Sequence, residues 1–124
     1  MICFKCKCEE FATKLAVVTQ VVRDEQLDVE TPVSVCISCG WQTLGKGQTD
    51  ELRKRAADAY RQKNGLLTSA EIVSRRKSLG MSQSDFAAYL RVGEASVKRL
   101  ETWQIQDTGK DKRIRLKSDF KFRL

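Results

Sequence analysis

The amino-acid sequence predicts an α+β fold in which a small antiparallel sheet precedes an all-α domain. Three observations predict it. Residues 11–22 are rich in β-branched side chains, and apolar residues then alternate with polar ones from Leu27 to Ile37. A pair of cysteines stands at each end of that region. After residue 49, apolar residues recur at helical spacing between helix start and stop signals.

The first domain, residues 1–48, is expected to be a hairpin. The β-branched segment forms its first strand, and residues 23–26 form a polar turn. The second strand begins at Leu27, and we expect it to be interrupted near Thr31-Pro32, because proline cannot donate a hydrogen bond to a sheet. This strand runs directly into the second cysteine pair.

Helices are expected over the rest of the chain. A helical linker region covers residues 49–67, with a helix from Asp50 to Lys63 that Asn64-Gly65 ends. Residues 68–107 hold three short helices, two of which start at capping boxes. Their expected bounds are Thr68 to Gly80, roughly 83–90 and about 94–103, with capping boxes at Thr68–Glu71 and Ser82–Asp85. The basic C-terminal segment, residues 108–124, suits a strand, a short helix, or a tail that orders on a partner.

The charge is divided unevenly. The 124 residues carry a net charge of +7. Residues 1–50 hold five basic and seven acidic side chains, whereas residues 51–124 hold 18 basic and nine acidic ones. The second part therefore has the electrostatic footprint of a polyanion binder. Charge alone does not separate nucleic acid binding from an ordinary lysine-rich surface.

The sequence favours a cytoplasmic protein. No run of about 18 apolar residues is present to span a membrane, and the start lacks the basic and apolar segments of a signal peptide. In that reducing compartment, five cysteines favour metal binding over disulfides.

Four cysteines have the spacing of a metal site. Cys3 and Cys6 form one CxxC pair, Cys36 and Cys39 form another, and 29 residues separate the pairs. Two CxxC turns supply tetrahedral sulfur coordination, which suits structural zinc. Catalytic zinc is disfavoured, since it usually takes histidine or carboxylate ligands and the chain has no histidine. Because this ribbon is too small to fold by core burial alone, zinc should contribute to its folding.

The fifth cysteine leaves a choice of ligands. Cys8 could replace Cys6, but the spacing of Cys3 and Cys6 is the better one, so Cys8 is set aside as a bystander. Two other interpretations of the cysteines are unrelated free thiols and a thioredoxin-type redox motif. The redox motif is disfavoured, because it needs one CxxC and no βαβ pattern surrounds either pair.

The last two of the three short helices have the pattern of a helix-turn-helix. Ala87 is small where the second helix must approach closely, and Val92 fills the turn. Val97 and Leu100 seat the second helix, whose outward N-terminal part is the part that enters the major groove in such motifs. The predicted DNA-binding residues are Gln83, Glu94, Ala95, Ser96, Lys98 and Arg99.

Each polar member of this set has a candidate role. Arg99 can donate two hydrogen bonds to guanine O6 and N7, whereas Ser96 and Lys98 suit phosphates or base edges. Gln83 starts the preceding helix, where a phosphate meets the helix dipole. Glu94 is either a specificity element or an N-terminal helix charge. A solvated basic face is the alternative for Lys98 and Arg99, but the scaffold and the adjoining basic segment favour DNA.

A joint motif links the two halves of the chain. It combines the two cysteine pairs with Asn64-Gly65-Leu66-Leu67-Thr68, Ser82-Gln83 and Ala95-Ser96-Val97-Lys98-Arg99. Over roughly residues 1–107 this combination resembles the MqsA (YgiT-type) antitoxin family, and the second half is similar to XRE/Cro-like regulators.

The resemblance implies two partners. In that family the zinc half binds and neutralises a toxin, often an RNA-cleaving one, and the helix-turn-helix half dimerises and represses its operon at a palindrome. Arg99 would read bases. Ala95 stands where the best-known member has a base-reading asparagine, so a different operator is expected. The basic stretch Lys110–Leu124 replaces a dimerising helix, which leaves the dimer geometry open.

Two functional hypotheses result. The first is a transcriptional repressor and antitoxin, which acts as a homodimer by binding operator DNA and a protein toxin. The alternative is a stand-alone regulator whose zinc ribbon is structural or senses metal or oxidation, and Cys8 motivates the oxidation part. An enzyme is not expected, because the sequence offers no histidine, no phosphate-cradling glycine loop and no visible nucleophile–base pair.

Overall fold

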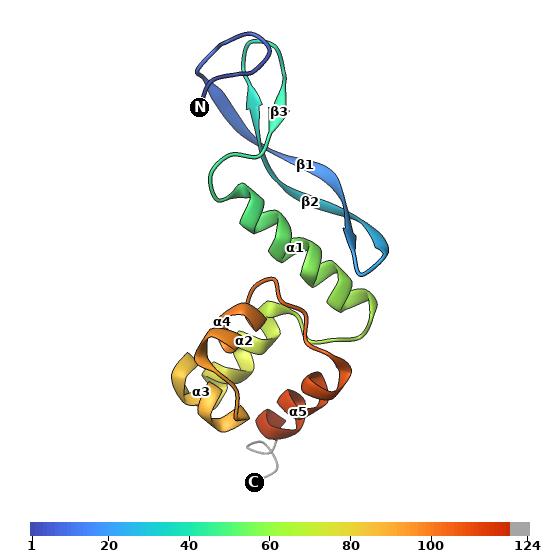
Figure 1. Ribbon diagram of the computed structural model, residues 1–124, viewed down its shortest axis with the longest axis vertical. Coiled ribbons are helices and arrows are strands. Elements are labelled where there is room, and N and C mark those ends of the chain that lie inside the picture. The colour runs from blue at the N-terminus through green and yellow to red at the C-terminus, as the bar shows by residue number, and fades with distance from the viewer. Residues whose placement is uncertain (120–124) are drawn as a thin grey trace. The chain divides into compact units, whose positions relative to one another are not determined.

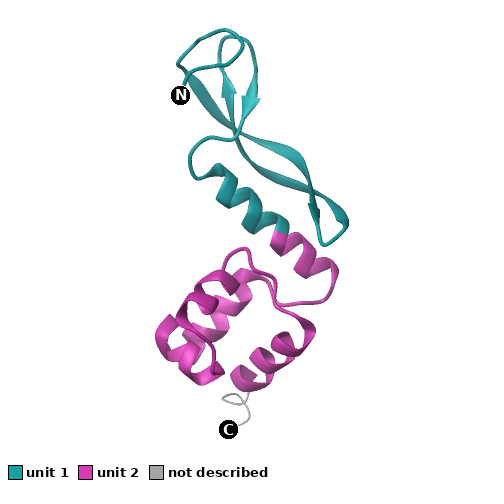
Figure 2. Ribbon diagram, in the orientation of Figure 1, with its two compact units in different colours: residues 1–56 teal, residues 57–124 magenta. Residues whose placement is uncertain are grey.

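A computed structural model, which describes residues 1–119, has an α+β architecture (Figure 1). Within those residues a three-stranded antiparallel sheet precedes five helices, as the sequence predicted at this level. The chain divides into two compact units, residues 1–56 (unit 1) and the part from Ala57 onward (unit 2), and helix α1 (Gln48–Lys63) crosses the division (Figure 2). No helix in the described part of the chain has both the length and the apolar character needed to cross a membrane.

Unit 1 is built on a long hairpin. Strand β1 (Phe11–Val22) pairs with β2 (Glu25–Cys36) along its whole length, and the short β3 (Gln42–Thr43) pairs with the end of β2. The first strand is confirmed, but the turn that follows it is shorter than the predicted residues 23–26. Only Arg23 and Asp24 connect the strands, both with positive φ (47° and 68°), which is the backbone form that two-residue hairpin turns favour.

The expected interruption of the second strand near Thr31-Pro32 is wrong. Pro32 pairs with Leu15 in an unbroken ladder from Phe11 to Val22. The short β3 pairs only with Ser34 and Val35, so Pro32 lies where β2 has a single neighbouring strand. A proline is tolerated there, because its missing N–H removes no ladder bond on the open side.

One face of β2 supplies most of the apolar core of unit 1. Alternate residues of this strand are buried, namely Leu27, Val29, Thr31, Val33 and Val35. The first turns of α1 pack beside them with Leu52 and Ala56 buried. Two hydrogen bonds tie α1 to β2, from Ser34 Oγ to Gln48 Oε1 and from Arg55 Nη1 to the Glu30 carbonyl (both 2.9 Å). The hairpin is therefore braced by the helix that follows it.

Unit 2 is a helical domain with its own core. Its helices are α2 (Ser69–Ser78), α3 (Gln83–Leu90), α4 (Glu94–Leu100) and α5 (Thr108–Asp119). Their shared core consists of Leu67, Ile72, Phe86, Ala87, Leu90, Val97 and Ile114. The three predicted short helices are confirmed, although α4 ends at Leu100 rather than near residue 103. Of the forms left open for the basic segment, residues 108–119 adopt a helix, and residues 120–124 lie outside the described part.

The two predicted capping boxes differ. The first is complete, since Thr68 Oγ1 accepts from Glu71 N–H and Glu71 Oε1 accepts from Thr68 N–H (3.3 and 3.1 Å). In the second, Ser82 Oγ accepts from Asp85 N–H (3.0 Å), but the described contacts include no return bond. Aspartate is one methylene shorter than the glutamate that a capping box uses, so it reaches less far back.

Candidate metal centre and helical surface

Two loops of matching backbone geometry carry the four paired cysteines. In the first loop, the N–H of Lys7 donates to the Cys3 carbonyl (3.0 Å), and Lys7 has a φ of 65°. In the second, the N–H of Gly40 donates to the Cys36 carbonyl (2.9 Å), and Gly40 has a φ of 78°. Each loop therefore folds back in a left-handed step directly after its second cysteine, which brings both sulfurs of a pair to one side.

The four sulfurs converge on one point. All lie within 4.8 Å of one another, and two pairs across the loops, Cys3–Cys39 and Cys6–Cys36, are 3.5 and 3.4 Å apart. A disulfide would require about 2.0 Å. Sulfurs that share one zinc-sized ion at about 2.3 Å lie about 3.8 Å from each other in a tetrahedron. The predicted ligands therefore form a cluster that suits a metal ion rather than disulfides.

The electrostatics of the cluster also favour a cation. The N–H of Cys39 lowers the pKa of the Cys36 thiol to about 6, although burial opposes it. The Trp41 N–H acts to lower the pKa of Cys39, but burial and the three neighbouring thiols together raise it to about 12. At Cys3, burial is outweighed by the N–H groups of Cys6 and Lys5, so its pKa is lowered. The raised pKa of Cys39 reflects the cost of placing another negative charge beside these sulfurs, and a divalent cation would remove that cost.

Cys8 lies outside the cluster. Its Sγ accepts a hydrogen bond from the Glu10 N–H at 3.4 Å. Its carbonyl accepts from the Cys3 N–H at 2.8 Å, so the backbone of Cys8 helps to close the first cysteine loop. The structural role of this residue is therefore carried by its main chain.

The turn between α3 and α4 is tight. Arg91 adopts a left-handed φ of 59°, and the Val92 N–H donates to the Ala87 carbonyl at 2.9 Å. Ala87, Val97 and Leu100 are buried and Val92 is partly buried against the same core, as the sequence predicted. The two helices are thus fixed at their junction by backbone geometry and by a shared apolar contact.

The residues predicted to bind DNA divide into two groups. Those on α4 lie on its outer surface, where Glu94, Ala95, Lys98 and Arg99 are exposed and Ser96 is half-buried. Lys98 Nζ lies 3.9 Å from Glu94 Oε1, a weak exposed pair, and Arg99 Nε donates to Gln104 Oε1 at 2.8 Å. This face of α4 remains accessible to a ligand.

Gln83 is placed differently. Its Nε2 donates to Glu101 Oε1 at 3.0 Å, and that carboxylate also accepts from Arg76 Nε and Nη2 (2.7 and 3.1 Å). The side chain of Glu101 is only 5% exposed. Gln83 therefore braces the start of α3 against the end of α4 rather than pointing freely outward.

A buried polar network in unit 2 has no counterpart among the sequence predictions. Arg61 of α1 is fully buried and donates to Gln106, which in turn donates to Asp111 and to the Leu67 carbonyl. Burial raises the pKa of Asp111, but donors on Leu67, Gln106 and Arg115 outweigh it and lower the pKa below its usual value. The only sequence signal was the position of Arg61, four residues after the buried Ala57 on one face of α1.

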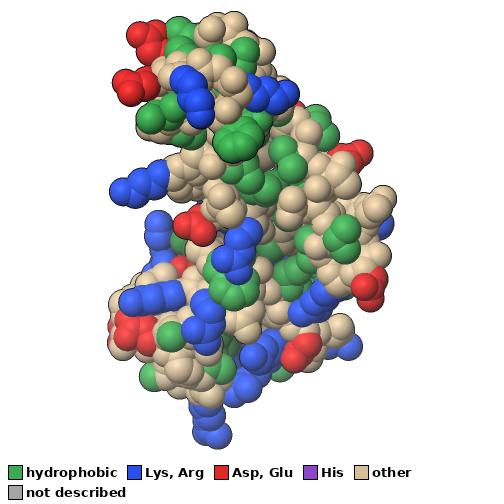
Figure 3. Space-filling view, turned by 45° about the horizontal axis from the view of Figure 1, so that its top comes forward, with side chains coloured by type: hydrophobic (Ala, Val, Ile, Leu, Met, Phe, Trp, Pro, Cys, Tyr) green, Lys and Arg blue, Asp and Glu red, His purple; other side chains and the backbone are tan. Residues whose placement is uncertain are grey.

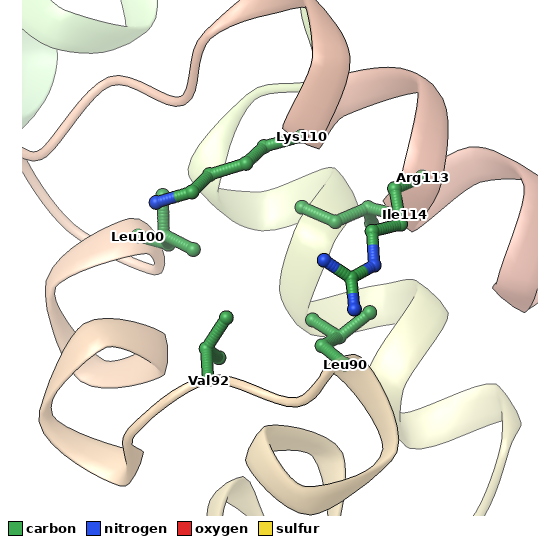
Figure 4. A pocket seen from close by; sticks show the side chains of 6 residues that line it. All are labelled: Leu90, Val92, Leu100, Lys110, Arg113 and Ile114. Atoms are coloured by element: carbon green, nitrogen blue, oxygen red, sulfur yellow. The ribbon is translucent and has the colours of Figure 1, made fainter.

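Basic side chains gather on unit 2. Figure 3 shows Lys and Arg side chains over the helices, interrupted by a few acidic ones. Two of them rim an apolar hollow between α5 and the α3–α4 turn, where the side chains of Lys110 and Arg113 reach over an apolar floor (Figure 4). The floor consists of Leu90, Val92, Leu100 and Ile114. Cations thus stand on α5 as well as on α4.

Comparison with protein-family models, with curated proteins and with solved structures gives no match. The function is therefore inferred from the residues of the chain itself. Two features carry it, the cysteine cluster of unit 1 and the outer surface of α4 in unit 2.

Proposed function

We propose that the protein is a transcriptional repressor and antitoxin, in which α3 and α4 form a helix-turn-helix that binds operator DNA. The supporting observation is the two-sided character of α4. Its inner side is buried through Val97 and Leu100, while Lys98 and Arg99 are exposed on its outer side. A short helix seated in this way after a tight turn is the geometry that places base-reading side chains in the major groove.

The charges of unit 2 support a polyanionic ligand. From residue 57 onward the chain carries 15 basic and eight acidic side chains. Exposed cations on α2, in the α3–α4 turn and on α5, namely Lys77, Arg91 and Lys112, suit phosphate contacts, which position a protein on DNA without reading its sequence. Arg99 is the base reader of this proposal, because it is exposed, its Nε donates to Gln104, and its two Nη groups make no hydrogen bond among the described residues and can serve a guanine edge. A homodimer on a palindrome is the expected assembly, as in the family that the sequence resembles.

The metal of the cysteine cluster is proposed to be zinc, with Cys3, Cys6, Cys36 and Cys39 as its ligands. Four sulfurs and no histidine suit a closed structural site, which leaves no position for a catalytic water. The ion would hold the two cysteine loops together at one end of the hairpin. The protein would act by binding and not by catalysis.

The toxin-binding part of the proposal rests on β1. This strand is an edge of the sheet, and three apolar side chains on one of its faces, Leu15, Val17 and Val21, are 60%, 67% and 64% exposed. On the same face, Glu30 pairs across from Val17 and Asp28 from Thr19. An exposed apolar edge strand is a ready surface for strand addition, and the adjacent carboxylates favour a partner with basic groups.

The DNA-binding part is tested by selection from a pool of random-sequence duplexes with the full-length, zinc-loaded protein. We expect enrichment of a palindromic sequence and binding to it that weakens steeply as salt increases, because phosphate contacts release counterions. If no sequence is enriched and no duplex binds at low salt, the repressor assignment is wrong.

The antitoxin part has a separate test. The protein is coexpressed with the product of the adjacent open reading frame, and the complex is recovered by affinity capture. We expect a stable complex that is lost in a Val17→Lys variant and kept in a Thr13→Lys control nearer the cysteine loops. Absence of any complex with the wild-type chain would remove the antitoxin role and leave the DNA-binding role intact.

A further inference from the structure

Arg61, in the last turns of α1, is both fully buried and fully hydrogen-bonded. Its exposed fraction is 0%. A guanidinium has five N–H donors, and all five are used. They donate to Gln106 Oε1 (3.1 Å), to Asp58 Oδ1 (2.9 Å), and to the carbonyls of Leu100, Thr102 and Gln104 (2.9, 2.9 and 2.6 Å).

Three of these five bonds fix the chain where it leaves α4. The last carbonyls of a helix have no partner within the helix and form the negative end of its dipole. Arg61 supplies a donor and a positive charge to the carbonyl of Leu100, the last residue of α4, and it also donates to the carbonyls of Thr102 and Gln104 in the segment that follows. Since Arg61 belongs to α1, nearly 40 residues earlier, the path of this segment depends on a tertiary contact rather than on local sequence.

Gln104 connects this segment to Arg99 through two bonds. Its N–H donates to the Arg99 carbonyl (3.0 Å), and its Oε1 accepts from Arg99 Nε (2.8 Å). The first bond holds the main chain of Arg99 and the second sets the plane of its guanidinium. An exposed arginine without such a bond samples many rotamers, whereas bidentate pairing with a guanine edge requires one orientation.

We propose that Arg61 is a positioning residue for DNA reading, which acts through Gln104 to orient the guanidinium of Arg99. The inference rests on the proposed function, in which Arg99 reads a base. Arg61 itself is buried and does not touch DNA. Its role is to place the Gln104 carbonyl, and with it the side-chain oxygen that engages Arg99 Nε.

The test measures discrimination rather than affinity alone. The probes are a duplex that the wild-type protein selects from a random pool and single-substitution derivatives of it. The base pair at which Arg99→Ala loses discrimination is identified first, with an expected loss of about 5- to 150-fold. Gln104→Ala should then lose about 3- to 10-fold at that same base pair and none at the others, since an unbraced Arg99 still pairs part of the time.

Conservative and matched variants separate positioning from folding. Gln104→Glu keeps the acceptor and should retain discrimination. Gln62→Ala is the matched control, an exposed glutamine on α1 next to Arg61, and should bind and unfold as the wild type does. Arg61→Lys keeps the charge but has three donors in place of five. It should lower both the melting temperature and the discrimination at the Arg99 base pair, and adding Gln104→Ala should reduce that discrimination no further.

The outcomes are distinguishable. If Gln104→Ala keeps full discrimination at the base pair where Arg99→Ala has lost it, the positioning role of Arg61 through Gln104 is wrong and the proposed function still stands. An equal loss at every base pair in Arg61→Lys and Gln104→Ala also overturns the positioning role, because that pattern indicates a purely structural role. If the wild-type chain selects no sequence, the proposed function is wrong, and the positioning role of Arg61 is wrong with it.

Discussion

Each of the two units of the chain is stabilised internally in its own way. Unit 1 buries one face of β2, leaves the opposite surface of β1 exposed, and gathers four cysteine sulfurs within 4.8 Å at one end of its hairpin. Unit 2 has a continuous core of seven buried apolar residues, to which α5 contributes Ile114, and a fully satisfied arginine beneath α4. We therefore expect unit 1 to need a bound ion for its fold, and unit 2 to fold through its own apolar core and buried hydrogen bonds.

The two units also differ in the chemical character of their exposed surfaces. The exposed stripe of unit 1 is apolar and lies on an edge strand, which suits a protein partner. The exposed surface of unit 2 is basic and lies on a short seated helix, which suits DNA. Stability and binding should therefore separate along the division between the two units.

The largest expected effect is that of removing the metal. Chelation, or Cys36→Ser, should unfold unit 1 and spare unit 2, because structural zinc contributes about 10–16 kcal/mol of apparent binding free energy to small domains. In amide NMR spectra, the signals of residues 11–36 should collapse while those of the helices after residue 69 remain. A sheet that survives in metal-free Cys36→Ser protein would contradict the comparison.

Removing volume from the core of unit 2 should destabilise unit 2 and leave unit 1 unchanged. Ile114→Ala truncates a side chain that is 2% exposed in the core of unit 2 and should cost about 2–5 kcal/mol of unfolding free energy there. Denaturant unfolding monitored by helical signals should shift, while metal retention by unit 1 should not change. The exposed Leu116→Ala on the same helix is the control, with an expected change below about 0.5 kcal/mol.

Because of the buried network, the stability of unit 2 should fall as the pH is lowered. The pKa of Asp111 is lowered in the folded state, chiefly by the Leu67 N–H, with Gln106 and Arg115 adding to it, against the opposing effect of burial. Its carboxylate therefore stabilises unit 2 fully above its unfolded pKa of about 3.9 and loses that contribution as pH falls through the lower folded value. Asp111→Asn should cost about 3 kcal/mol at neutral pH. The difference from wild type, measured by unfolding at several pH values, should shrink in acid, and a constant difference would argue against it.

The smallest expected effect concerns Cys8. Its sulfur lies outside the cluster, so Cys8→Ser should leave metal binding and DNA affinity unchanged, with or without peroxide. Metal content and duplex binding before and after oxidation check this. A peroxide response that disappears in Cys8→Ser would favour the alternative of an oxidation-sensing regulator.

Local signals made much of this architecture predictable. The β-branched run predicted β1 to the residue, and the capping box at Thr68 and the Asn64-Gly65 stop predicted where helices begin and end. The cysteine spacing predicted which four sulfurs come together. Each of these features is decided by residues within a few positions, or by a spacing that has one common meaning.

Other features depend on distant residues and could not be predicted. Whether Pro32 breaks β2 depends on how far β3 extends beside it. The helix at residues 108–119 is decided by Ile114 entering a core supplied by four other segments, since its own sequence is mostly charged. The bonds of Arg61 join residues about 40 positions apart, so the sequence showed only a basic side chain where the structure has a buried brace.

The central claim is that the two units serve two different ligands. It is tested most directly by amide hydrogen exchange of the full-length, zinc-loaded protein with and without a duplex that it has selected. The account predicts new protection in α4, at residues 94–99, and at the start of α3, with no change along residues 15–21 of β1. Protection along β1 with none in α4 would contradict it.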